Sequence, residues 1–211
     1  NPDQTAQINI SLQSGETATG TAMSWGYLPA LARWSPFHGA LYAVIDAVAR
    51  IVAAGGCHRT VRLTLQEYFE KLGNDPKKWG KPFSALLGAL YAQQQLGVAA
   101  IGGKDSMSGT FKDRAVPPTL VAFALTAIDA SKVISPEFKK AGHAVVLLPI
   151  PRDAQEMPDF NAVHAAYDAL HRAIAGGTVV AAHTVRTGGV AEACHRPRIA
   201  GLRQERRALL H

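Results

Sequence analysis

The chain has 211 residues, of which 47% are hydrophobic and 18% charged, and its formal net charge is +6. This length suits one large domain or two small ones, and the composition is that of a globular protein. We find no apolar run that reads as a membrane span and no signal-peptide pattern at the start, so we expect no membrane association.

The basic charge and the cysteines narrow the range of partners. Arginines gather between His195 and His211, and aromatic residues make up only 7% of the chain. A nucleic-acid-binding surface needs a basic stripe interleaved with aromatics, so we expect anionic small ligands such as nucleotides and no nucleic acid. Cys57 and Cys194 lie far apart without paired spacing, which excludes a disulfide framework and a zinc site and favours a cytoplasmic location.

The first 130 residues predict strands and helices in alternation. Alternating apolar residues over 7–25 predict a hairpin that turns at Ser14-Gly15-Glu16, and residues 27–39 indicate an irregular connection. The other predicted elements are a helix from Ala40 to Ala53 ended by Gly55-Gly56, a strand from Val61 to Leu65, a polar stretch from Lys71 to Lys81, a helix from Pro82 to Leu96 whose apolar face holds Phe83, Leu86, Leu87, Leu90 and Tyr91, a strand from Leu96 to Ile101 and a strand from Thr119 to Ile128.

The rest of the chain predicts a second domain. A boundary falls in the segment Ser131 to Gly142, and the pattern dissolves after Cys194, where we expect an exposed or ragged end. The whole predicts an α/β or α+β protein with domains at 1–130 and 131–211, the first incomplete at its start and the second truncated. The predicted elements of the second domain are a strand from Ala144 to Leu148, a loop from Pro149 to Pro158, a helix from Phe160 to Ala175, a strand from Thr178 to His183 and a helix start from Val190 to Cys194.

One polar stretch follows the strand that ends at Ile101. It runs Gly102-Gly103-Lys104-Asp105-Ser106-Met107-Ser108 and supplies two glycines, one cation, one acid and two hydroxyls. Phosphate groups need backbone N–H groups, a mobile positive charge and hydroxyl donors, and a carboxylate can hold their divalent cation. The alternative is an ordinary polar turn, because turns are rich in Gly and Ser.

A second polar pair lies within the helix predicted from Ala40 to Ala53. Asp46 and Arg50 are four residues apart and therefore share one face of the helix. They could form a surface ion pair, or both side chains could lie over a bound ligand.

These stretches together resemble phosphoribosylformylglycinamidine synthase, the large glutamine- and ATP-dependent amidotransferase family of purine biosynthesis. The similarity covers most of residues 18–129 and is looser in the second part. The matching stretches are ATGTAMSWGY, WSPFHGALYAVIDAVARIVAAGG, TLQEYFEKLGNDPKKWGKPFSALLGALYAQQQLG, AAIGGKDSMSGTF and VPPTLVAFALTAID, followed more loosely by SPEFKKAGHAVVLLP and VVAAHTVRTGGVAEA.

The resemblance implies a fold and a place within a larger enzyme. The family holds two tandem units of the aminoimidazole-ribonucleotide-synthetase type, each a mixed sheet with packed helices followed by a C-terminal α/β domain. The motifs here resemble the second unit, so the glutaminase domain and the first unit lie outside this chain. The whole enzyme would be a ligase that converts formylglycinamide ribonucleotide to formylglycinamidine ribonucleotide, and we expect no catalytic residue in this chain and little or no activity from it alone.

The resemblance also implies a nucleotide and magnesium site, with ATP or ADP and Mg²⁺ as ligands. Asp105 matches the motif acid, and Asp46 stands where the family commonly has a glutamate; both are expected as metal ligands. For the nucleotide, the expected contacts are Gly102, Gly103, Lys104, Ser106 and Arg50.

Three positions depart from the family pattern. Arg50 replaces an asparagine that binds metal in some members, and arginine has no lone pair to offer a cation. It would touch a phosphate instead, or pair with Asp46 and disable the site. Both acids of a later Asp-x-x-Asp-Gly-Gly pattern are absent from Thr184 to Gly189.

The open alternatives are therefore a nucleotide-binding segment of the synthase, a non-binding scaffold segment of the same enzyme, and an unrelated small kinase or synthetase. Because an incomplete sheet exposes edges and apolar surface, we also expect self-association.

Overall fold

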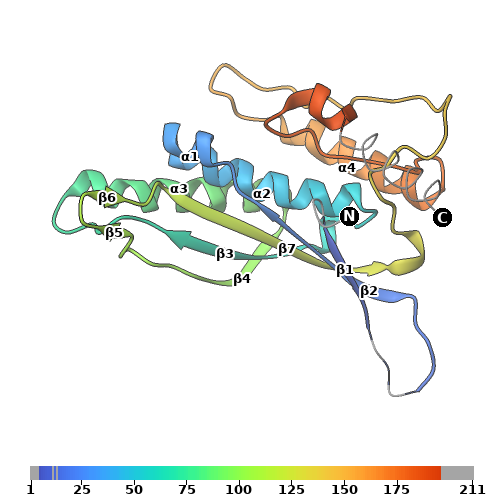
Figure 1. Ribbon diagram of the computed structural model, residues 1–211, viewed down its shortest axis with the longest axis horizontal. Helices are drawn as coiled ribbons and strands as arrows, with labels where there is room; N and C mark the ends of the chain where they lie inside the picture. The colour runs from blue at the N-terminus through green and yellow to red at the C-terminus, as the bar shows by residue number, and fades with distance from the viewer. Residues whose placement is uncertain (1–4, 11, 13, 196–211) are drawn as a thin grey trace, which may run out of the picture.

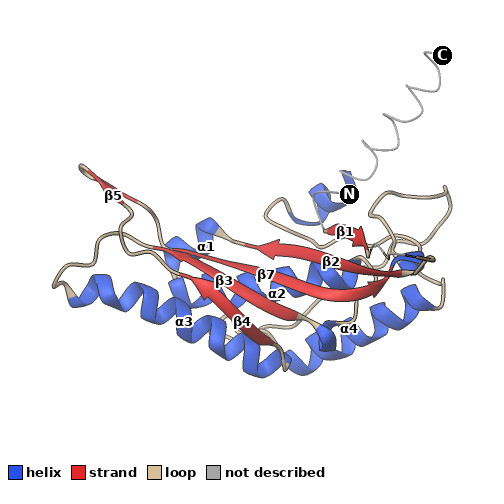
Figure 2. Ribbon diagram, turned by 90° about the horizontal axis from the view of Figure 1, so that it is seen from below, coloured by secondary structure: helices blue, strands red, loops and turns tan. Residues whose placement is uncertain are grey.

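The computed structural model describes residues 5–10, 12 and 14–195. Its centre is a five-stranded mixed sheet, which the helices cover on one face only (Figures 1 and 2). The strand order is β1-β2-β7-β3-β4, with β3 and β4 parallel and the other neighbours antiparallel. The strands are β1 (Ala6–Asn9), β2 (Thr19–Gly26), β3 (Arg62–Tyr68), β4 (Ala99–Lys104) and β7 (Thr119–Asp129), and the two-residue strands β5 (Thr110–Phe111) and β6 (Arg114–Ala115) pair with each other.

Four helices and two short 3₁₀ turns connect and cover these strands. They are α1 (Pro29–Trp34), α2 (Pro36–Ala53), η1 (His58–Thr60), α3 (Pro76–Leu96), η2 (Ala130–Lys132) and α4 (Phe160–Ala175). Residues 189–195 are also helical, as the pattern from Val190 to Cys194 predicts. The hairpin, the strand β7 and the helix α4 are confirmed. The expected ragged end after Cys194 falls almost wholly outside the described residues.

Helices α2 and α3 both begin earlier in the chain than predicted, at Pro36 and at Pro76, and the reason is the same for both. Each helix begins at a proline that follows a capping side chain: Ser35 accepts a hydrogen bond from the His38 N–H, and Asp75 accepts one from the Lys77 N–H. A proline at the first helical position loses no hydrogen bond, because that N–H has no partner within the helix. The irregular connection predicted for 27–39 is therefore wrong, since it contains α1 and the first turn of α2.

The core lies between the sheet and α2, and small residues bring the two layers close together. The buried face of β2 carries Ala22 and Ser24, and the Ser24 hydroxyl donates to the Ala47 carbonyl of α2 at 2.6 Å. A Cβ placed on Gly26 would lie 2.0 Å from the Ala43 carbonyl oxygen, so only glycine allows this approach. By length and composition α2 could cross a membrane, but 61% of it is buried, as in the core helix of a soluble protein.

Helix α3 packs against the core with a different face from the one that its apolar periodicity predicts. Small residues face the core, among them Ala85, Gly88 and Ala89, and a Cβ on Gly88 would lie 2.0 Å from the Phe37 carbonyl oxygen. The large residues that the periodicity picks out as its apolar face are instead exposed: Phe83, Leu86, Leu87, Leu90 and Tyr91.

The two strands predicted for the second domain are wrong. Residues 144–148 and 178–183 have no strand partner within the described part of the chain. Val145 and Val146 are consequently exposed, at 66% and 75% of their surface. Their β-branched sequence favours a strand, but a strand also requires a neighbour that supplies the ladder hydrogen bonds.

Candidate functional site

The polar stretch predicted to bind phosphate lies at the carboxyl ends of the parallel strands β3 and β4. Gln66 and Lys104 are the last register partners of the two strands. The pairing continues one step further, because the Ser106 N–H donates to the Glu67 carbonyl at 3.1 Å and the Phe69 N–H donates to the Ser106 carbonyl at 2.9 Å. The stretch is therefore fixed by main-chain hydrogen bonds at an end of the sheet where ligands commonly bind in α/β proteins.

The two glycines of the stretch belong to β4 rather than to the turn after it. A Cβ on Gly103 would lie 2.4 Å from the Leu65 carbonyl oxygen, so the close approach of β3 requires a glycine there. A Cβ on Gly102 would meet no atom within 4 Å. The glycine pair predicted that another group passes close to the backbone. At Gly103 that group is the neighbouring strand β3.

The side chains that follow face solvent. Lys104 is exposed, with its Nζ atom 5.6 Å from the centroid of the Tyr68 ring. Asp105 is exposed as well. The hydroxyls of Ser106 and Ser108 are hydrogen-bonded to each other at 2.9 Å. One ammonium, one carboxylate and two hydroxyls therefore lie within five consecutive residues, from Lys104 to Ser108.

Glu67 is the residue that sequence reasoning missed. It is only 6% exposed, and its Oε1 atom is buried without a hydrogen-bond partner in the described part of the chain. It stands opposite Asp105 in the continued register, and burial, with the Asp105 charge second, raises the pKa of Glu67 to about 7. A signal was present, because the strand alternation puts Glu67 on the same buried face as Leu63.

Asp46 and Arg50 form a tight ion pair on α2. Asp46 accepts hydrogen bonds from Arg50 Nη2 at 2.7 Å and from Arg50 Nε at 3.2 Å. Arg50 is fully buried, and its guanidinium carbon lies 4.5 Å from the centroid of the Trp25 ring. Arg186 lies on the same ring at 5.3 Å, within the segment where the family pattern has acids.

The two predicted parts of the site are not brought together. Arg50 contacts Trp25 on β2, whereas Asp105 follows β4, and β7 and β3 lie between those strands. Within residues 5–10, 12 and 14–195, no group of three or more His, Cys, Asp and Glu side chains could hold a metal ion. Glu67 and Asp105 form a carboxylate pair that fits a cation retaining several waters, whereas Asp46 is already neutralised by Arg50.

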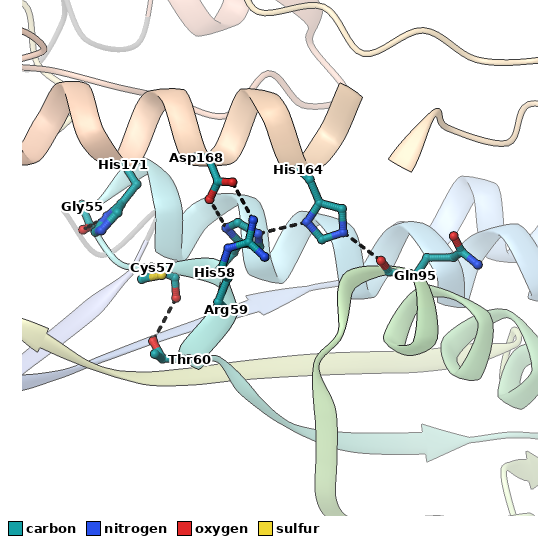
Figure 3. Close-up of polar contacts among 9 residues, drawn as sticks. All are labelled: Gly55, Cys57, His58, Arg59, Thr60, Gln95, His164, Asp168 and His171. Atoms are coloured by element: carbon teal, nitrogen blue, oxygen red, sulfur yellow. Dashed lines mark hydrogen bonds and ion pairs between the residues drawn. The ribbon is translucent and has the colours of Figure 1, made fainter. Parts of the chain in front are cut away.

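A separate polar cluster joins α4 to the end of α2 (Figure 3). His58 is fully buried, and its Nε2 lies 3.0 Å from Nδ1 of His164, whose Nε2 lies 2.8 Å from the Gln95 carbonyl. That carbonyl can only accept, so His164 Nε2 carries a proton, and a neutral His164 must accept the His58 Nε2–H. His58 Nδ1 then faces Asp168 at 3.7 Å without a hydrogen bond, while Asp168 pairs with Arg59 at 2.6 Å.

The charges around this cluster set its protonation. Burial lowers the pKa of His58, and the Asp168 carboxylate opposes that shift without reversing it. The hydrogen bond from Arg59 lowers the pKa of Asp168. These histidines and their carboxylate hold α4 against η1 and against the end of α3. Their polar atoms do not converge on one point where a ligand could bind.

The comparisons with known proteins give structural likeness only. No family model matches the chain, and no curated protein sequence matches it significantly. Phosphoribosylformylglycinamidine synthase II from Thermotoga maritima is similar in structure, with a TM-score of 0.55 and 22% identity over 64% of this chain and 21% of that chain. T. maritima PurL complexed with ADP gives a TM-score of 0.62 and 15% identity over 91% of this chain and 32% of that one.

A further structure, T. maritima PurL complexed with FGAR, gives a TM-score of 0.62 and 17% identity over 82% of this chain and 26% of that one. The chain thus spans between about a fifth and a third of the length of these proteins. The expected fold class is confirmed: the chain has a mixed sheet with packed helices, and its fold is similar to that of these solved structures.

Proposed function

We propose that this chain is a synthetase-like segment of an ATP- and glutamine-dependent ligase that converts formylglycinamide ribonucleotide to formylglycinamidine ribonucleotide in purine biosynthesis. Two observations support the proposal: the resemblance of the sequence motifs and the structural likeness to PurL proteins solved with ADP and with FGAR. The glutaminase and the reacting groups would be supplied by other parts of the enzyme, in the cytoplasm. The segment itself would bind a nucleotide with magnesium.

The observation that carries this role is the donor set at the ends of β3 and β4. Lys104 would offset phosphate charge, and Ser106 would donate its hydroxyl. Asp105, with Glu67 beside it, would hold Mg²⁺, which proteins bind through one or two carboxylates plus phosphate oxygens and water. Bound in this way, the ion would neutralise phosphate charge, while Gly102 and Gly103 would leave main-chain atoms accessible near the ligand.

The uncovered sheet face suits the proposed docking of the first synthetase-like unit. By strand alternation this face exposes the large apolar residues Met23, Tyr68 and Leu125, a composition that suits contact with another surface. In the whole enzyme this face would contact the other unit.

The second candidate function is a scaffold that binds no nucleotide. The Asp46–Arg50 ion pair favours it, because the acid expected as a metal ligand is held by a buried cation of the same helix. In that case the stretch from Gly102 to Ser108 would serve only to pack the interface with the first synthetase-like unit.

Calorimetric titration with Mg-ADP separates the two candidates. The binding proposal predicts saturable heat for the wild-type chain that disappears when EDTA removes the magnesium. It also predicts an affinity at least about tenfold lower for Lys104→Met, since a lost charge-assisted contact costs about 1.5–3 kcal/mol. Lys112→Met is the control, because Lys112 lies beyond the stretch and stacks on Phe111. Absence of heat and of any thermal shift at millimolar Mg-ADP would leave the scaffold role as the conclusion.

A further inference from the structure

The outer face of α3 is an exposed apolar surface that the fold does not use. Four large residues form a stripe along it: Trp79, Phe83, Leu86 and Leu90 are between 47% and 64% exposed. Leu87 extends the stripe at its flank and is 43% exposed. Figure 2 shows α3 along the outside of the helical layer.

The lack of charge on this face is as unusual as its apolar content. No Asp, Glu, Lys or Arg occurs from Pro82 to Gly97, although a helix that meets water normally carries charges on its outer side. The inner side of α3 is already satisfied by small residues packed against α2. Trp79 donates its indole N–H to the Gly73 carbonyl at 2.9 Å, whereas Phe83, Leu86 and Leu90 are exposed apolar residues that suit a helix packed from outside.

The spacing of the stripe identifies the geometry of that helix. The four residues follow each other at intervals of four, three and four, the pattern of a helix–helix seam. This pattern reads the same in both directions. A second α3 placed antiparallel would set Trp79 against Leu90 and Phe83 against Leu86, so each aromatic ring would meet a leucine.

The size of the surface is sufficient for such a pair. With the observed exposures, the five residues offer about 500 Å² per copy, since a large apolar side chain presents roughly 150–250 Å². Two copies would bury about 1,000 Å² in total, which is where specific protein–protein interfaces begin. From Pro82 to Gly97 the surface carries no charge, so this part brings no like charges together when it meets its own copy and offers no counter-charge to an acidic or basic partner.

We propose that α3 is a homotypic docking surface, through which two copies of this chain associate about a twofold axis with their α3 helices antiparallel. This contact is separate from the uncovered sheet face, which lies on the other side of the sheet from the helices. It does not depend on nucleotide binding. The contact is isologous, so each substitution in the stripe acts twice in one dimer.

Sedimentation equilibrium of the full chain tests the proposal. The wild-type chain should be a dimer at about 100 μM, and Phe83→Glu with Leu86→Glu should raise its dissociation constant at least about tenfold, because the variant buries carboxylates at the centre of the contact. Two controls should keep the dimer: Gln95→Glu, an exposed position off the stripe, and Leu125→Glu on the uncovered sheet face.

Helical circular dichroism verifies that the variants remain folded, and the neutral pair Phe83→Gln with Leu86→Gln should weaken the dimer in the same direction. A wild-type chain that stays monomeric at this concentration overturns the proposal. A dimer that survives both α3 variants, or that the Leu125 variant abolishes, overturns it as well.

Discussion

Two acidic side chains, Asp46 and Glu67, lie in positions that water reaches poorly, and the chain treats them in opposite ways. Asp46 finds Arg50 one turn further along α2, which neutralises it through two hydrogen bonds. Glu67 finds a second carboxylate, Asp105, across the parallel pair β3–β4. A buried charge must be paired or neutralised. Asp46 therefore has a cationic partner within the chain, although Arg50 Nη1 is left without a hydrogen-bond partner in the described residues, whereas Glu67 lies beside a charge of its own sign.

Replacing Arg50 should give the largest effect. Arg50→Met leaves Asp46 without its partner and should lower the free energy of unfolding by about 3–5 kcal/mol, the usual cost of breaking a buried ion pair. Urea unfolding measures the loss. The double variant Asp46→Leu with Arg50→Met should recover most of it, because no uncompensated charge remains. An Arg50→Met variant as stable as the wild type would show that the Asp46–Arg50 ion pair does not stabilise the folded chain.

Neutralising Glu67 should act in the opposite direction. Glu67→Gln should raise the free energy of unfolding by about 1–3 kcal/mol at pH 8, where the carboxylate is ionised, since it removes a buried charge that has no partner. The matched control is Glu70→Gln on the same segment. Glu70 pairs with Lys78 and Lys81, so its replacement should be destabilising if it has any effect. A loss of stability on neutralising Glu67 would contradict the contrast drawn with Asp46.

The His58 cluster extends the comparison to a third buried titratable group, because its contribution to the free energy of unfolding depends on pH. Burial lowers the pKa of His58, and His164, Arg59 and His171 add to that shift while Asp168 opposes it. The unfolded chain therefore binds more protons than the folded one below the ordinary histidine pKa of about 6.5. The contribution of His58 to stability should be constant above that pH and should fall by up to about 1.4 kcal/mol per pH unit as the pH drops towards the folded-state pKa.

Urea unfolding of Glu67→Gln between pH 7.5 and pH 5 measures this slope, because the raised pKa of Glu67 would otherwise add stability on acidification over the same range. His58→Gln should flatten it, while His143→Gln, at an exposed position, should leave it unchanged. A Glu67→Gln chain whose stability rises on acidification would mean that the Asp168 attraction outweighs the cost of burying the charged imidazole.

The smallest effect is expected at the rim of the same cluster. Arg59 is 60% exposed and pairs with Asp168, and exposed ion pairs contribute little because water and salt screen them. Arg59→Gln should therefore leave the urea midpoint unchanged within error. A clear loss would show that Arg59 is needed to hold α4 through Asp168.

Local sequence signals predicted most of the sheet layer. The hairpin, β7 and α4 followed from periodicity, and α4 has the predicted bounds. The starts of α2 and α3 could also have been found, since Ser35-Pro36 and Asp75-Pro76 each pair a capping residue with a proline at the first helical position. What periodicity cannot say is which side of a helix meets the core, and α3 puts its small residues there.

Features that depend on distant parts of the chain were out of reach. The segment 144–148 has the composition of a strand, but pairing needs a neighbour that no local pattern supplies. For the site, the motif identified Lys104, Asp105 and Ser106 as neighbours of an accessible strand end. It could not reveal that Asp46 and Arg50 lie near β2 instead, because the strand order brings two other strands between them.

The most direct test of the account compares Mg-ADP binding by two variants that each remove one acid, Asp105→Asn and Asp46→Asn. If the ends of β3 and β4 hold the magnesium, Asp105→Asn should weaken binding at least about tenfold, and Asp46→Asn should leave it within about twofold of the wild type. Calorimetric titration at one magnesium concentration gives both values. Binding that fails with Asp46→Asn and persists with Asp105→Asn would place the nucleotide near Asp46 and Arg50 on α2 and would contradict the account.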